Sequence, residues 1–138
     1  MDKTEARIRL AIDAMGSDLG PAEVLEGVAQ AVDRSPWNTE FVLFGQEEIV
    51  EPLISSHSIL SRSRVEFVHS PEVVGMEEKP IAGIKGKKKS SMSLALQALK
   101  DGEADALLSC GNTGCLMAGG AIKLRTLDGV ERPALCTI

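Results

Sequence analysis

Residues 8–21 read IRLAIDAMGSDLGP, and this stretch determines the class of fold. Its first six residues, 8–13, form a short and mostly apolar run that predicts a buried strand. Asp13 and two glycines end the run, and Pro21 can open a helix because its fixed φ suits the first helical turn. A strand, a tight loop and a helix in this order are the start of a βαβ unit.

The same alternation of short apolar runs with stretches at helical spacing continues along the chain. The expected strands are 8–13, 41–44, 65–68, 105–109 and 134–138. Their apolar runs are typical of strands that are covered on both faces. The pattern therefore predicts a single α/β domain over 1–138, a three-layer α/β/α Rossmann-like sandwich with a mainly parallel sheet.

Four helices are expected between these strands. They open at Pro21, lie near 46–54, run from an N-cap at Ser90 or Ser91 to a stop at Gly102, and begin near Thr113. The glycines of the last helix would permit its close approach to the sheet. Segment 70–89 is expected to be the longest irregular connection.

The last residues, 137–138, fall inside an expected buried strand, without the helix that a parallel sheet needs next on its face. We therefore expect a domain that is incomplete at its C-terminus, as in a truncated protein. A domain that another subunit completes is the alternative interpretation.

Composition argues against several classes of function. No segment approaches the roughly 20 consecutive apolar residues of a membrane span. The charged N-terminus also lacks the apolar stretch of a signal peptide, so we expect a cytoplasmic protein. The net charge of −5 argues against broad nucleic-acid binding, which normally needs a basic face. Three cysteines and two histidines favour neither a disulfide framework nor a metal site. Cys110, Cys115 and Cys136 are therefore interpreted as small packing residues.

The loop after the first strand contains two carboxylates and two glycines. In open α/β sheets, ligands bind at the carboxyl ends of the strands, where loops present backbone N–H groups. Asp13, Gly16 and Asp18 are therefore candidate site residues that orient a substrate or bind a cation. The alternative is that Asp13 only caps the turn, which the glycines allow.

The loop after the fourth strand, SCGNTG at 109–114, is a candidate phosphate cradle. Its glycines let the backbone approach an anion, while amide and hydroxyl side chains add donors at the positive end of a helix dipole. It is a near miss to the dinucleotide fingerprint G-x-G-x-x-G, with a serine first and no acidic residue about 20 positions later, so nucleotide binding is rejected. The alternative is a helix cap whose glycines serve packing only. The candidate residues are Ser109, Gly111, Asn112, Thr113 and Gly114.

The segment KGKKKSS at 85–91 places four lysines immediately before a helix. Cations there are repelled by the helix dipole, so the arrangement costs stability unless an anion lies among them. Lys87, Lys88, Ser90 and Ser91 are therefore candidates for anion binding. The segment is not a Walker A loop, which needs a glycine at the position of Lys88. A solvated charged loop is the alternative.

Together these three loops resemble the phosphate acyltransferases of bacterial phospholipid synthesis. The family opens with DAMGGD-H-GP, and this chain has DAMGSDLGP at 13–21, with Ser17 in place of a glycine and Leu19 in place of a histidine. The basic loop ends in Ser-Ser-Met as in the family, and SCGNTGCLMA at 109–118 matches the family's S-x-G-N-T-G-x-L-M-A. The resemblance covers nearly the whole chain but under half of a family member.

The resemblance implies an isocitrate/isopropylmalate dehydrogenase-like sandwich and a reaction in which phosphate attacks the thioester of acyl-acyl carrier protein to form acyl phosphate. No cofactor and no metal are implied, and the general acid and acyl-chain pocket would lie outside this chain. The resemblance implies that Asn112, Thr113 and the N–H groups around Gly111 and Gly114 bind phosphate. It implies that Lys87 and Lys88 bind phosphate or the carrier protein. Asp13 and Asp18 would form the opposite wall of the site.

The partners that the resemblance implies are acyl carrier protein, inorganic phosphate and a second subunit in a homodimer, with peripheral contact to the membrane. Two other functions remain open from the residues alone. A phosphotransacetylase-like enzyme would use acyl-coenzyme A on a similar sheet. A non-catalytic binding or regulatory module is favoured by Leu19 and by the short length.

Overall fold

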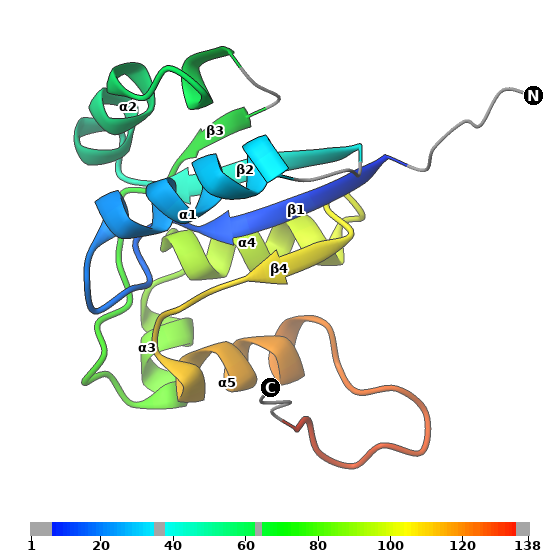
Figure 1. The fold of residues 1–138 in the computed structure, drawn as a ribbon. Helices are drawn as coiled ribbons and strands as arrows, with labels where there is room; N and C mark the ends of the chain where they lie inside the picture. Colours follow the sequence, from blue (N-terminus) through cyan, green and yellow to red (C-terminus); the bar gives the residue numbers. More distant parts are fainter. Residues whose placement is uncertain (1–6, 35–37, 63–64, 135–138) are drawn as a thin grey trace, which may run out of the picture.

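Four parallel strands form the central sheet of the computed structural model, which describes residues 7–34, 38–62 and 65–134 (Figure 1). The strands are β1 (Ile8–Asp13), β2 (Thr39–Gly45), β3 (Val65–His69) and β4 (Ala106–Leu108), in the spatial order β3-β2-β1-β4. β1 lies in the interior, paired with β2 along its whole length and with β4 over residues 10–12. The prediction of an α/β fold with a parallel sheet is confirmed.

Five α-helices and one short 3-10 helix lie in the described part of the chain. They are α1 (Pro21–Arg34), α2 (Glu47–Ser56), η1 (Leu60–Arg62, the 3-10 helix), α3 (Pro80–Gly86), α4 (Ser91–Lys100) and α5 (Thr113–Lys123). α1 and α2 cover one face of the sheet, and α4 covers the other (Figure 1). No helix within these described ranges is both long enough and apolar enough to cross a membrane.

The alternation of side chains along the two interior strands explains why helices lie on both faces. Ile12 and Leu43 belong to the apolar cluster under α1 and α2, whereas their neighbours Ala11 and Val42 belong to the cluster under α4. All four side chains are at most 4% exposed. The consecutive apolar residues that mark these strands in the sequence are therefore what a doubly covered sheet requires.

A third apolar cluster lies beside the sheet, where α3, α4 and α5 meet. It contains Val74, Ile84, Met92, Leu96 and Cys115. α5 packs mainly against α3 and α4, contrary to the expectation that its glycines bring it onto the sheet. Gly119 makes the helix contact possible, because a Cβ at this position would lie only 2.4 Å from Leu96 Cδ1.

The structure differs from the elements expected from the sequence at three places. Segment 70–89 is expected to be irregular, but α3 occupies residues 80–86, and only Gly83 and Ile84 of this helix are buried. Two adjacent buried residues produce no helical periodicity, which explains why the pattern misses α3. β4 is also shorter than the expected 105–109. The expected strand 134–138 begins at Ala134, which is not in a strand, and its remainder lies outside the described residues.

Leu43 provides a test of this packing, because its side chain is fully buried at the centre of β2. Replacing Leu43 with Ala should lower the free energy of unfolding by about 3 kcal/mol, since the substitution removes buried methyl groups and leaves a cavity. Urea denaturation followed by circular dichroism measures the change. The matched control is Leu19→Ala at a 76% exposed position, which should change stability by less than about 0.5 kcal/mol. Equal effects of the two substitutions would contradict the described core.

Candidate functional site

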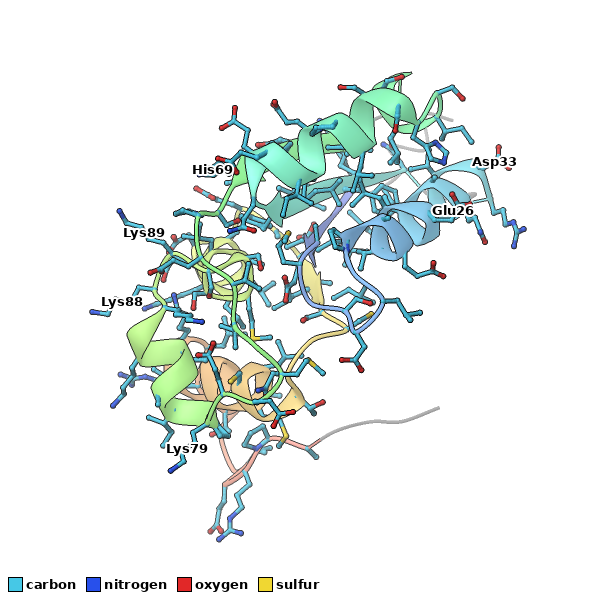
Figure 2. All side chains as sticks on the ribbon, turned by 90° about the vertical axis from the view of Figure 1, so that its left-hand side faces the viewer. Glu26, Asp33, His69, Lys79, Lys88 and Lys89 are labelled. Atoms are coloured by element: carbon cyan, nitrogen blue, oxygen red, sulfur yellow. The ribbon has the colours of Figure 1, made fainter. Side chains whose placement is uncertain are left out.

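The loops predicted to bind ligands meet at one edge of the sheet. β1 ends at Asp13 and the parallel strand β4 ends at Leu108, so the loops that follow them leave the sheet at the same edge. The N-terminus of α4 reaches this edge as well, because Ser91 is hydrogen-bonded to Asp13. Figure 2 views the molecule from this side. The three loops singled out in the sequence therefore lie together at the carboxyl edge of the sheet, where ligands bind in open α/β folds, and they form the candidate site.

Asp13 lies at the centre of the three loops. Its Oδ1 accepts hydrogen bonds from Ser91 Oγ at 2.6 Å and from the N–H groups of Gly16 at 3.1 Å and Met15 at 3.2 Å. Its Oδ2 accepts one from Ser109 Oγ at 2.8 Å. The side chain is only 2% exposed. This geometry favours the turn-capping interpretation, because the carboxylate is already surrounded by donors of the protein.

The loops approach one another so closely that two positions leave no room for a side chain. A Cβ on Gly16 would lie 2.9 Å from Ser109 Oγ of the other loop, and a Cβ on Gly111 would lie 3.0 Å from the Cα of Gly16. Gly16 is buried. These two glycines therefore serve the contact between the β1 loop and the β4 loop.

Ser109 extends the hydrogen bonds of Asp13 into the candidate cradle. While its hydroxyl donates to Asp13, its oxygen accepts from the N–H of Gly111 at 3.1 Å. The N–H of Gly111 is therefore already paired, which corrects its expected role as a donor to an anion. Through Ser109, the Asp13 carboxylate determines the position of the backbone immediately before α5.

The side chain of Asn112 is fully used inside the protein. Its Nδ2 donates to the carbonyl oxygens of Gly75 at 3.0 Å, Met76 at 3.0 Å and Glu78 at 2.9 Å, and its Oδ1 caps α5 by accepting from the N–H of Cys115 at 3.0 Å. The residue is 8% exposed. The expected contact of this amide with an anion is therefore not what the side chain makes here; it links α5 to the loop 75–78.

Three backbone donors remain at the start of α5. Among the described residues, none accepts a hydrogen bond from the N–H groups of Asn112, Thr113 or Gly114. Thr113 is exposed, so its hydroxyl is also accessible beside these groups. Unpaired N–H groups and the positive end of the helix dipole together favour an anion. We call these three N–H groups and the Thr113 hydroxyl the α5 cradle.

The lysines of segment 85–91 divide into two groups. Lys87 Nζ donates to the carbonyl oxygen of Val73 at 2.7 Å and pairs with Glu78, which also accepts from the N–H of Gly75. The hydrogen bond from Lys87 holds the pKa of Glu78 below its usual value. Lys88 is exposed, and no ion pair joins it to another described residue. Lys87 therefore stabilises the loop 73–78, whereas Lys88 is accessible.

The other predicted residues also separate into internal and accessible positions. Ser90 is buried and caps α4 by accepting from the N–H of Ser93 at 3.2 Å, and Ser91 donates to Asp13. Asp18 is exposed and, within the part of the chain that the structure describes, has no side-chain hydrogen bond or ion pair. No group of three or more histidine, cysteine, aspartate or glutamate side chains with metal-binding geometry occurs among the described residues.

The two described cysteines differ in their surroundings. Cys115 is fully buried, and burial raises the pKa of its thiol, which confirms its interpretation as a packing residue. Cys110 is exposed, so the same interpretation is wrong for this position. The reason is that Cys110 follows the edge strand β4 and lies outside the contact between the loops. Cys136 lies outside the described residues.

The loop 73–78 contributes to the candidate site, although no pattern in the sequence indicates it. Glu78 and the carbonyl groups of this loop connect Lys87 to Asn112, over separations of 9 and 34 residues. No periodicity relates these positions, and carbonyl oxygens carry no sequence signature. The one available signal was an acidic residue close to a run of lysines.

Comparison with known proteins identifies relatives of this chain. The model of a family described as "Fatty acid synthesis protein" matches residues 8–138. A phosphate acyltransferase of Azorhizobium caulinodans is 46% identical over 134 residues, which are 96% of this chain and 37% of that protein. Phosphate acyltransferases of Levilactobacillus brevis and Aeromonas salmonicida are 41% and 44% identical over 94% and 91% of this chain. The chain spans between 36% and 37% of the length of these three relatives.

Replacing Asp13 with Asn tests the hydrogen bonds that connect the three loops. One carboxylate oxygen then becomes an NH₂ group that cannot accept, so at least one of the buried donors around it loses its acceptor. The free energy of unfolding should fall by about 1–3 kcal/mol, and hydrogen exchange at the Gly111 amide should become faster. Urea denaturation and amide exchange by NMR measure the two effects. Asp18→Asn removes a charge from the same loop at an exposed position and should change neither quantity.

Proposed function

Because this chain belongs to the phosphate acyltransferase family, we propose that it contains the phosphate-binding site of an enzyme that transfers a fatty acyl group to inorganic phosphate. The observation that carries this proposal is the α5 cradle, with its three unpaired N–H groups at the carboxyl edge of the sheet. The residues around the cradle are held by hydrogen bonds within the protein. Backbone donors that are fixed at the start of a helix bind an anion with little reorganisation.

The chemistry requires little from the protein beyond placement. An oxygen of phosphate attacks the carbonyl carbon of an acyl thioester, the carbon–sulfur bond breaks, and acyl phosphate and a thiol are released. Phosphate is already a nucleophile at neutral pH, so no covalent intermediate with the protein is needed. The catalytic contribution is then the orientation of phosphate against the thioester and the stabilisation of the oxyanion that develops.

We assign the roles of the residues by whether their polar groups are hydrogen-bonded within the protein or remain accessible to a ligand. Asn112, Thr113 and Gly114 bind phosphate through their N–H groups, and the Thr113 hydroxyl is a further donor. Asp13, Gly16, Ser91, Ser109 and Gly111 hold the loops in place, and Ser90 and Lys87 hold the elements next to them. Asp18 and Lys88 are the accessible charged residues on the two sides of the site.

The acyl donor that we propose is acyl-acyl carrier protein, and the acyl phosphate product serves phospholipid synthesis. We further propose that residues 1–138 form a single α/β domain of the isocitrate/isopropylmalate dehydrogenase-like class, within a homodimeric enzyme of the cytoplasm that contacts the membrane peripherally. Helices on both faces of a parallel sheet support the proposed class.

Thr113→Pro tests the α5 cradle without removing a helix cap. Thr113 is the first residue of α5, where proline is tolerated, and Asn112 before it has φ −58° and ψ 107°, which is compatible with a following proline. The substitution deletes one unpaired N–H group. It should weaken phosphate binding about tenfold or more, because hydrogen bonds to charged groups contribute about 1.5–3 kcal/mol each.

Isothermal titration with inorganic phosphate measures this effect. The matched control is Thr113→Ala, which removes the hydroxyl but keeps the N–H group and should bind phosphate more tightly than Thr113→Pro. Equal affinities of Thr113→Pro and the unchanged protein, with folding intact, would remove the α5 cradle from the proposed site.

Acyl phosphate formation tests the proposed reaction directly. Purified protein is incubated with phosphate and acyl-acyl carrier protein, and the product is trapped with hydroxylamine as a hydroxamate. We expect turnover with the carrier-protein donor to exceed turnover with acyl-coenzyme A. A preference for acyl-coenzyme A would indicate the phosphotransacetylase-like reaction, and phosphate binding without turnover from either donor would indicate a binding module.

A further inference from the structure

An apolar groove runs along α1, on the face of the sheet that this helix covers. Its volume is about 360 Å³, which is within the range of small-molecule sites in proteins. Among the described residues that line it, only Glu23 is charged. We call it the α1 groove, and its large apolar side chains are those of Leu10, Ile12, Val24, Val28, Phe41 and Leu108.

The groove exists because α1 covers β1 and β2 but not β4. Ile12 and Leu108 are partners in the parallel register of β1 and β4, so their side chains lie side by side on one face of the sheet. Ile12 is 2% exposed, whereas Leu108 is 47% exposed. Figure 1 shows α1 in front of the sheet and no described helix in front of β4. The described part of the chain therefore leaves an apolar strip of the sheet open to a ligand beside α1.

A glycine in the wall of the groove keeps this strip open. Gly27 lies in the middle of α1, where glycine weakens a helix relative to alanine. Packing does not explain it, because a Cβ at this position would meet no atom of a neighbouring element within 4 Å. Val24, Gly27, Val28 and Ala31 all line the groove and lie on one stripe of the helix. A side chain at position 27 would therefore occupy the groove.

The α1 groove begins at the loops of the candidate site. Its lining includes Ser17 of the loop after β1 and Cys110 of the loop after β4. Cys110 precedes Asn112, the first residue of the α5 cradle, by two positions, which span at most about 7 Å of backbone. A ligand with its anionic group in the cradle therefore has an apolar surface directly beside that group.

We propose that the α1 groove binds the fatty acyl chain of the substrate. This inference rests on the proposed function, because the acyl phosphate product carries its phosphate at one end of a hydrocarbon chain. The cradle and the groove together match both parts of such a molecule. The acyl chain is then bound within residues 1–138, whereas the resemblance to the family implies an acyl-chain pocket outside this chain.

A hydrocarbon chain fits this lining better than an extended segment of polypeptide. A polypeptide carries backbone N–H and C=O groups that need partners when they leave water, whereas a hydrocarbon chain needs none. In the described lining, the side chains of Ser17 and Glu23 are polar, and both lie toward the carboxyl edge of the sheet, in the loop after β1 and in the first turn of α1. From Glu23 to Ala31 the wall extends for about 12 Å, and beyond its first turn it is apolar.

Gly27→Leu tests the α1 groove by filling it. The matched control is Gly120→Leu in α5, where a Cβ also meets no atom of a neighbouring element within 4 Å and which does not line the groove. Each substitution replaces a helical glycine with a good helix former, so neither should lower the Tm measured by circular dichroism. A change in ligand binding is then not a consequence of unfolding.

Isothermal titration with butyl, hexyl, octyl and decyl phosphate, each below its micelle concentration, measures the contribution of the chain. In the unchanged protein and in Gly120→Leu, affinity should rise by up to about fourfold for each methylene group, which corresponds to about 0.8 kcal/mol, until the groove is filled. In Gly27→Leu this dependence on chain length should be lost. Its affinity for inorganic phosphate should not change, because Gly27 lies outside the α5 cradle.

Protection of Cys110 from alkylation locates the bound chain. Cys110 is exposed and lines the groove, so it should react with N-ethylmaleimide, and peptide mass spectrometry measures the rate at this residue. Decyl phosphate should slow the reaction severalfold in the unchanged protein and in Gly120→Leu. Inorganic phosphate at equal occupancy should slow it less, because it leaves the groove empty.

Primary alcohols of the same chain lengths separate this inference from the proposed function, because they test the groove without the cradle. Alcohol affinity that rises with chain length, and loses this dependence in Gly27→Leu, supports the groove even where inorganic phosphate fails to bind; that failure would contradict only the proposed function. Equal dependence on chain length in the two glycine variants overturns the α1 groove as the acyl-chain site. A changed oligomeric state of Gly27→Leu with unchanged chain binding also overturns it, and assigns the groove to a second copy of this chain.

Discussion

The arrangement of the site depends on one buried carboxylate. Asp13 ends the central strand β1 and accepts hydrogen bonds from the loop that follows it, from the start of α4 and from the loop after β4. A buried carboxylate is costly to remove from water unless its oxygens are paired, and here both oxygens are paired by groups from elements 78 and 96 residues away. These hydrogen bonds therefore hold the three loops together, next to the unpaired N–H groups at the start of α5.

A second set of contacts connects the cradle to its surroundings. In the loop 73–78, Asn112 satisfies three carbonyl groups, and Lys87 satisfies that of Val73 while pairing with Glu78. This loop has little regular structure, so its carbonyl groups need partners from side chains. Asn112 and Lys87, which the sequence suggested as ligand-binding residues, therefore form hydrogen bonds to the backbone of this loop. The groups that remain accessible to a ligand are backbone N–H groups, the Thr113 hydroxyl and exposed charged side chains.

Much of the fold could be predicted from the sequence, because strands covered on both faces and capped helices have local signals. The runs at β1, β2 and β3 and the caps at Ser90 and near Thr113 are examples. That the three loops lie together could also be predicted, since parallel strands bring their carboxyl ends to one edge of the sheet. The roles of single residues could not be predicted in the same way. Asn112 and Lys87 bind carbonyl groups of a loop whose course has no periodic pattern in the sequence. The contact of α3 with α5 depends on glycines whose neighbours in space are distant in the chain.

The two outer strands of the sheet differ in how their free edges are protected. β3 carries the charged residue Glu66, which pairs with Arg9 of β1, and it ends at His69. β4 is only Ala106–Leu108, with no charged residue, and Leu108 is 47% exposed. Within the described residues no strand pairs with its outer edge. An uncharged strand edge is a template for backbone pairing, so of the two outer strands of the described sheet β4 is the one that accepts a further strand.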